Sequence, residues 1–218
     1  MFAEFFKDDF VYRADLTAFP DREHTFLVRA QDIEGNTQET SMKFNIDSTL
    51  PILTLSNSQG QPIPEGSFTN TYKLTAQTQD MFSGLDTVKL FNPNGAELPQ
   101  TKTFDGATTL QSLEFSLDGL LDGIYKVQAQ DKSKNVQTVN FVLDTTPPNL
   151  AGSFNDPNIN IEASDSGSGI TLIQIKDASG AIINETTLAG PPSANFSLSV
   201  ASLADGDYQV VAIDRIGN

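Results

Sequence analysis

Hydrophobic and polar residues alternate along much of the chain, and a period of two indicates half-buried β-strands. Tyr125, Val127 and Ala129 lie in one phase of such a segment, and polar side chains occupy the other phase. Turn signals such as Asn-Pro-Asn-Gly at 92–95 separate the segments, and no helical stripe is apparent. The alternation predicts an all-β fold with strands near residues 72–79, 86–91, 110–117, 136–143, 158–164, 170–176, 195–200 and 207–213.

One pattern recurs three times, and it indicates how the strands are grouped. An aromatic residue is followed by alternating Val, Ala and Asp and then by an Asn, over 26–36, 125–135 and 208–218. The first two copies run on into Asp-Ser-Thr-Leu-Pro at 47–51 and Asp-Thr-Thr-Pro-Pro at 144–148. A repeat that extends from residue 48 to residue 144 and holds about seven short strands is typical of an antiparallel β-sandwich. We therefore expect unit boundaries after Asp47 and Asp144.

The recurring hairpin and the Asp-Thr-Thr-Pro-Pro boundary at 144–148 resemble the bacterial immunoglobulin-like (Big-type) tandem repeats of large extracellular surface proteins and adhesins. The resemblance implies all-β, immunoglobulin-like antiparallel β-sandwiches in tandem. Residues 1–47 would be the C-terminal part of a first repeat, 48–144 a complete repeat, and 145–218 a third repeat that lacks its last strand. The first and last units would thus be incomplete pieces of a longer protein.

The middle copy departs from the other two at one position. Lys134 stands where Gly35 and Gly217 stand in the flanking copies. Because a left-handed backbone favours glycine over residues with a Cβ atom, we expect the middle loop to have a different shape.

The charge balance excludes several classes of partner. The 218 residues carry 28 acidic and 13 basic side chains, a formal net charge of −15, which argues against binding to nucleic acid or to an anionic membrane surface. No apolar stretch is long enough for a membrane-inserted helix. The chain contains no Cys, so disulfides and thiolate chemistry are excluded.

Few residues are available for catalysis or for stacking on a sugar. His24 is the single histidine, and the polar residues around it predict a solvated turn, so we do not expect an enzyme. Trp is absent, and Tyr72, Tyr125 and Tyr208 occupy the inward phase of their strands, which predicts that they belong to the core.

Acidic residues recur where strands end, and this is the chemistry that the sequence favours. In a sandwich of this topology, two loops and the incoming linker meet at one pole. Their carboxylates would repel one another unless a proton or a cation intervened. The predicted metal ligands are Asp47, Asp80, Asp131 and Asn135 at the first junction and Asp144, Asp165, Asp214 and Asn218 at the second. Calcium, which prefers hard oxygen ligands, is the natural structural cofactor, and the resemblance implies that it rigidifies junctions. The alternative is that these residues only accept backbone N–H groups in tight turns.

Two functions remain open from the sequence. The first is a structural spacer or stalk of a secreted or cell-surface protein, whose partners are neighbouring repeats of the same chain, with a host or surface ligand reached through other domains. The second is an accessory module of a secreted hydrolase that aids substrate or surface binding.

Overall fold

The computed structural model describes residues 5–8, 11–14, 16 and 19–218, and they form an all-β protein. One 3-10 turn, Val200–Ser202, is the only helical element among them. Accordingly, the described part of the chain holds no helix that is long and apolar enough to cross a membrane.

Two hairpins occupy the N-terminal part of the chain. β1 (Phe5–Asp8) pairs with β2 (Val11–Ala14), and β3 (Arg22–Gln31) pairs with β4 (Thr37–Ile46), all antiparallel. His24 is not the turn residue that its polar neighbours suggested, because it lies within β3 opposite Phe44. Its ring stacks on Phe44 with the centroids 5.8 Å apart, and Nε2 donates to the carbonyl of Pro20 at 2.8 Å.

Two facing sheets form the next part, the middle unit (residues 52–143). Its strands are β5 (Ile52–Ser56), β6 (Phe68–Thr69), β7 (Lys73–Gln79), β8 (Leu85–Phe91), β9 (Lys102–Ala107), β10 (Gln111–Ser116), β11 (Gly123–Asp131) and β12 (Val136–Leu143). One sheet has the order β10-β7-β5 and the other β6-β12-β11-β8-β9, with β6 parallel to β12 and the other pairs antiparallel. A single buried apolar cluster fills the space between the sheets.

The period-two pattern identifies most, but not all, of this core. Tyr125, Val127 and Ala129 are fully or almost fully buried, and the Tyr125 ring stacks on that of Phe141 at 5.7 Å. Tyr72 was expected in the core and is instead 64% exposed. The reason is that β7 begins only at Lys73, so the alternation of the strand does not extend to Tyr72.

A smaller pair of sheets forms the C-terminal unit (residues 149–214). Its strands are β13 (Asn149–Asn155), β14 (Asn158–Ser164), β15 (Ile170–Asp177), β16 (Ile182–Thr187), β17 (Ser193–Ser199) and β18 (Tyr208–Asp214). The sheet orders are β13-β14-β17 and β16-β15-β18, and Ala163, Ile170 and Ile173 form the centre of their core. Among the described residues β18 has a neighbour on one side only, whereas β11 lies between β8 and β12.

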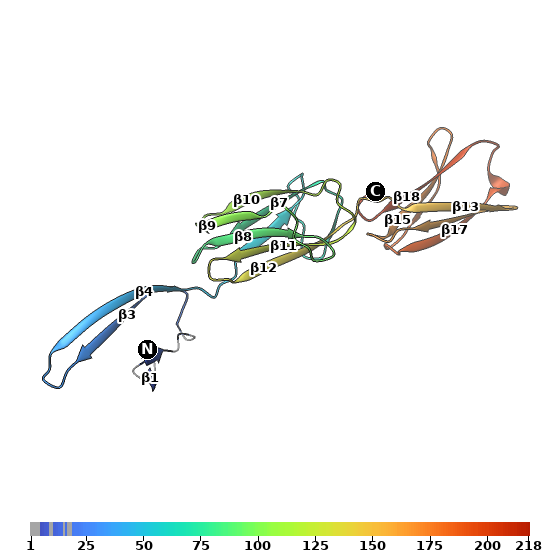
Figure 1. The fold of residues 1–218 in the computed structure, drawn as a ribbon. Helices are drawn as coiled ribbons and strands as arrows, with labels where there is room; N and C mark the ends of the chain where they lie inside the picture. The colour runs from blue at the N-terminus through green and yellow to red at the C-terminus, as the bar shows by residue number, and fades with distance from the viewer. Residues whose placement is uncertain (1–4, 9–10, 15, 17–18) are drawn as a thin grey trace.

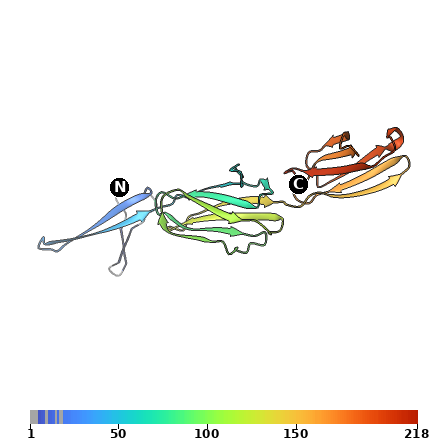
Figure 2. The ribbon, with the colours of Figure 1, turned by 90° about the horizontal axis from the view of Figure 1, so that it is seen from above.

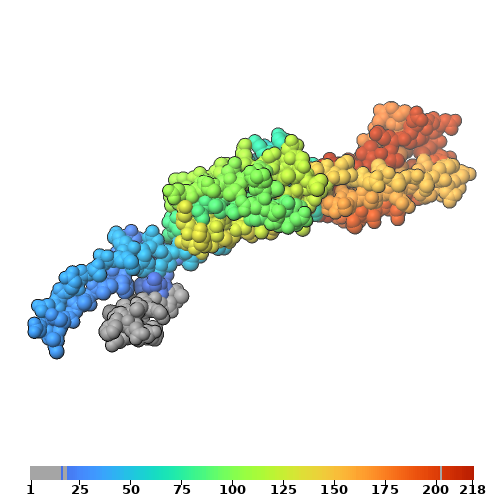
Figure 3. All heavy atoms as spheres, in the orientation of Figure 1, coloured from blue at the N-terminus to red at the C-terminus, as the bar shows by residue number. Residues whose placement is uncertain are grey.

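The parts follow one another in an extended row (Figures 1 and 2). The β3–β4 hairpin forms one end, the middle unit lies at the centre, and the C-terminal unit forms the other end, as the space-filling view also shows (Figure 3). The last residues of the chain do not lie at the far tip of the row. They lie at the end of the C-terminal unit that faces the middle unit (Figure 1).

Candidate metal centres at the two junctions

Three chain segments bring carboxylates together at the first junction. Asp80 follows β7 and continues its inward phase after Leu74 and Ala76, and Asp131 ends β11 in the phase of its core residues. Both side chains are buried at the rim of the core, with 2% and 0% of their surface exposed. Asp47 comes from the linker after β4 and is half-buried. Oxygens from the three carboxylates lie within 4.8 Å of one another.

The second junction repeats this arrangement. Asp144 lies in the linker after β12, Asp165 follows β14, and Asp214 ends β18. All three are buried, and one oxygen from each lies within 4.8 Å of the others. We name these groups the first cluster (Asp47, Asp80, Asp131) and the second cluster (Asp144, Asp165, Asp214). The structure thus gathers the three predicted aspartates at each junction.

The two predicted asparagines lie beside the clusters with a different role. The Nδ2 group of Asn135 donates to Asp131 Oδ2 at 2.7 Å and to the Asp47 carbonyl at 3.1 Å. Nδ2 of Asn218 donates to the Asp144 carbonyl at 2.9 Å. Because these partners can only accept, the amide NH₂ must face them. Each asparagine therefore ties the linker to the loop through its amide nitrogen.

The loop that carries each asparagine has one shape in all three copies. A backbone N–H donates to an Asp Oδ1 four residues earlier, at 2.8 Å, in Asp32–Asn36, Asp131–Asn135 and Asp214–Asn218. The expectation of a different middle loop is wrong, because Lys134 has a φ of 74° and so adopts the left-handed conformation of Gly35 and Gly217. The left-handed conformation costs a residue with a Cβ atom about 1–2 kcal/mol. The loop hydrogen bonds and the 2.7 Å ion pair from Lys134 to Asp86 offset this.

Hydrogen bonds within the turns account for only half of the oxygens of three buried carboxylates. Asp80 Oδ1 accepts from the N–H groups of Phe82 and Gly84 at 3.1 and 2.7 Å, while its Oδ2 is buried without a partner. Oδ2 of Asp165 and Oδ2 of Asp214 are also buried without a partner. A buried polar atom left unpaired costs about 1–3 kcal/mol. Turn formation alone therefore does not explain why these carboxylates are buried.

Electrostatics within the clusters also disfavours the charged form. Burial raises the pKa of Asp80, and the charges of Asp47 and Asp131 raise it further, against the opposing N–H bond from Gly84. Burial likewise raises the pKa of Asp165, with the charges of Asp144 and Asp214 adding to it. A positive charge placed between the carboxylates would relieve both effects.

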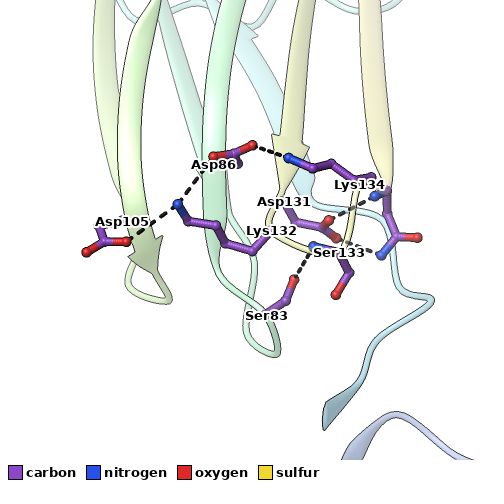
Figure 4. A network of polar contacts seen from close by, with 8 residues as sticks. Ser83, Asp86, Asp105, Asp131, Lys132, Ser133 and Lys134 are labelled. Atoms are coloured by element: carbon purple, nitrogen blue, oxygen red, sulfur yellow. Dashed lines mark hydrogen bonds and ion pairs between the residues drawn. The ribbon is translucent and has the colours of Figure 1, made fainter. Parts of the chain in front are cut away.

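The lysines of the middle loop do not supply that charge. Lys132 reaches Asp86 and Asp105 at 3.3 and 3.5 Å, and Lys134 reaches Asp86, so both ammonium groups are held by other carboxylates (Figure 4). Figure 4 shows the Lys134 ammonium directed toward Asp86 and the Lys132 ammonium directed toward Asp86 and Asp105. The clusters offer oxygen donors only, which is the donor set of a hard cation such as Ca²⁺.

A second pair of aspartates also fixes the linkers, and the sequence reasoning missed them. Asp122 accepts from the N–H and Oγ1 of Thr145 at 2.7 and 2.8 Å and from Oγ1 of Thr146. Asp21 accepts in the same way from Ser48 and Thr49. Although burial opposes it, these bonds lower the pKa of Asp122. The repeated Ser/Thr pair directly after the linker Asp was the available signal.

Comparison with known proteins gives likenesses in structure only. No protein-family model matches the sequence, and no curated protein matches it. A tetra-tandem repeat in the extending region of a large adhesion protein is 23% identical, with a TM-score of 0.37, covering 94% of this chain and 56% of that one. A Ca²⁺-stabilized adhesin that helps an Antarctic bacterium reach out and bind ice is 17% identical, with a TM-score of 0.30, covering 95% and 56%.

A third similar structure is dimeric latent PorU from Porphyromonas gingivalis, 14% identical with a TM-score of 0.31, covering 90% of this chain and 23% of that one. This chain thus spans about half the length of the two adhesin structures. At these identities and TM-scores, none of the three assigns a family or a function to it.

Proposed function

We propose that this chain is a spacer segment of a large extracellular or cell-surface protein of the adhesin kind, in which calcium fixes the junctions between tandem immunoglobulin-like sandwiches. The proposed units are residues 1–47, 48–144 and 145–218. The strand order of the middle unit supports this, because β10-β7-β5 facing β12-β11-β8-β9 has the two-sheet, Greek-key arrangement of such domains.

One observation carries the proposal: each junction gathers a linker carboxylate and two buried loop carboxylates into one cluster. The linker belongs to the connection and the loops belong to the next unit, so a cation held by all three would join them. Asp47, Asp80 and Asp131 would hold it at the first junction, and Asp144, Asp165 and Asp214 at the second. The buried Oδ2 atoms of Asp80, Asp165 and Asp214 have no hydrogen-bond partner, and they would be available as ligands for the cation.

Calcium fits this donor set better than other common ions. It accepts six to eight oxygen ligands with flexible geometry, and extracellular modules bind it with dissociation constants of about 10⁻⁴–10⁻³ M. A cluster of three carboxylates and no nitrogen or sulfur donor does not favour zinc. The net charge of −15 adds a long-range attraction for cations.

In this proposal the chain performs no catalysis, and its role is to hold neighbouring units in a fixed orientation. Asn135 and Asn218 hold the linker carbonyls, and Asp21 and Asp122 hold the Ser/Thr residues of the linkers. The linkers are thus oriented before a cation binds, which lowers the conformational entropy lost on binding. The partners would be neighbouring repeats of the same chain, and a surface ligand would be contacted by other domains.

X-ray scattering in solution tests the proposal. We expect an extended rod in millimolar calcium and a broader range of shapes after chelation. Asp80→Asn combined with Asp165→Asn should give the chelated behaviour even in calcium, because asparagine keeps the Oδ1 acceptor of the turn and removes the charge. Asp32→Asn is the matched control, since Asp32 lies in the same type of loop and belongs to neither of the two clusters. Identical scattering of the wild type with and without calcium would contradict the proposal.

A further inference from the structure

The two junctions differ in how the adjoining parts touch each other directly. At the second junction, the Arg215 guanidinium lies over the ring of Phe68 in the middle unit, 5.3 Å from its centroid. The Nδ2 group of Asn70 donates to the Ile216 carbonyl at 3.2 Å and to Asn218 Oδ1 at 3.0 Å. The loop of the C-terminal unit is therefore docked on the β6 region of the middle unit by contacts that involve no carboxylate.

The described residues at the first junction form no such contact. Lys132 occupies the position that Arg215 has in its loop, but it turns back to Asp86 and Asp105 of its own unit (Figure 4). Among the described residues, every hydrogen bond across this junction involves a linker residue. Asp47 Oδ2 accepts from the N–H of Ser83 at 3.0 Å, and the Asp47 carbonyl accepts from Asn135.

The two linker aspartates also differ in how closely the next unit packs around them: Asp144 is buried, and Asp47 is half-buried. The Asp144 carboxylate lies against Gly167, where a Cβ atom would approach its Cγ to 2.3 Å. The first junction has Phe82 at the position of Gly167, and Asp47 is only half-buried there. The second linker is therefore enclosed by its neighbouring unit, and the first is more open to water.

We infer that only the first junction is a cation-operated hinge, and that the second stays docked whether or not a cation is bound. This inference rests on the cation sites proposed above. Without a cation, the three carboxylates of each cluster repel one another. At the first junction this repulsion acts on the linker, which takes part in every hydrogen bond across the junction among the described residues. At the second junction, the ring contact of Arg215 and the amide contacts of Asn70 oppose the loss of alignment.

Distances between paired spin labels test the inference, and the absence of cysteine in the chain makes labelling specific. Thr40→Cys with Ser112→Cys spans the first junction, and Ser112→Cys with Ser197→Cys spans the second; all three positions are exposed. After chelation, the distance distribution of the first pair should broaden and that of the second pair should stay narrow. Calcium should restore the first pair to a narrow distribution.

Variants identify the contacts responsible. Arg215→Ala with Asn70→Ala should make the second pair broaden after chelation and narrow again in calcium. Lys132→Ala, the equivalent change at the first junction, should leave both pairs as in the wild type. Equal broadening of both wild-type pairs, with calcium binding intact by calorimetry, would overturn the hinge inference alone. Calcium binding absent from both calorimetry and the labelled pairs would overturn the cation sites as well.

Discussion

The loop at Asp32 and the loop at Asp131 have the same turn, yet their carboxylates have different surroundings. In both, the asparagine four residues later donates its backbone N–H and its side-chain amide to the two oxygens of the aspartate. Asp32 is exposed, and no other carboxylate of the described residues forms a cluster with it. Asp131 is buried beside Asp47 and Asp80. The turn thus accounts for the Asp–Asn pair but does not account for the convergence of three carboxylates.

The pKa values of Asp32 and Asp80 are shifted in opposite directions. The side-chain and backbone bonds from Asn36 lower the pKa of Asp32, as expected for a carboxylate that accepts several N–H bonds in water. Burial and neighbouring charges raise the pKa of Asp80 even though it also accepts turn bonds. The exposed loop therefore favours the charged form of Asp32 without a cation. The buried clusters disfavour charged carboxylates and so favour uptake of a proton or a cation.

Calcium should have the largest effect on stability, and it should act through the clusters only. Free calcium at 100 times the dissociation constant would add about 2.7 kcal/mol to the unfolding free energy for each occupied site. Thermal melts with calcium and with a chelator measure this. Asp32→Asn should leave the difference between the two melts unchanged. A smaller difference between the two melting temperatures in Asp32→Asn would mean that calcium does not act through the two clusters.

Neutralising one cluster residue should change stability in opposite directions under the two conditions. In calcium, Asp80→Asn removes a ligand and should lower the melting temperature. In chelator, the same change removes a buried charge beside Asp47 and Asp131, and it should stabilise the protein by on the order of 1 kcal/mol. Chemical unfolding under both conditions measures the sign. Destabilisation in chelator as well would favour the turn explanation.

The asparagines of the two loops allow a smaller comparison. Asn135→Ala loses the side-chain bond to Asp131 and also the bond to the Asp47 carbonyl, whereas Asn36→Ala loses the side-chain bond to Asp32. Asn135→Ala should therefore lower the free energy of unfolding by about 1 kcal/mol more than Asn36→Ala does. Equal losses in urea unfolding would indicate that the linker bond contributes nothing.

The pH dependence in chelator should give the smallest effect. The folded pKa of Asp80 is raised, so its contribution to stability is complete below the unfolded pKa and is lost as pH rises through the folded pKa. The folded pKa of Asp32 is lowered, so its contribution is present above the unfolded pKa and is lost as pH falls. The advantage of Asp80→Asn over the wild type should shrink on acidification from pH 7. The disadvantage of Asp32→Asn should shrink only at lower pH, as Asp32 itself is protonated.

Much of this molecule could be predicted from the period-two pattern, because burial on one face of a strand leaves a direct trace in the sequence. The expected strands at 72–79, 136–143 and 158–164 correspond to β7, β12 and β14. The pattern is weak where a strand is very short or exposed. The two-residue β6 and the fully exposed β13 were accordingly not predicted.

The site could be predicted only in part. The phase of β7 and β11 placed Asp80 and Asp131 at the core rim, since an inward phase continues one step beyond a strand. The direction of an amide group depends on its partners in space, so the sequence did not show that Asn135 Nδ2 donates to the Asp47 carbonyl. Whether a left-handed position tolerates lysine depends likewise on a distant partner, here Asp86 for Lys134.

Calorimetric titration of calcium into chelated protein tests the two clusters most directly. We expect two binding sites in the wild type, one in Asp80→Asn, one in Asp165→Asn, and two in Asp32→Asn. Each of the cluster variants keeps its turn acceptor, so a lost site cannot be attributed to a lost turn. Absence of a binding heat in the wild type, together with equal melting temperatures in calcium and in chelator, would contradict the cation sites and leave the aspartates as turn residues only.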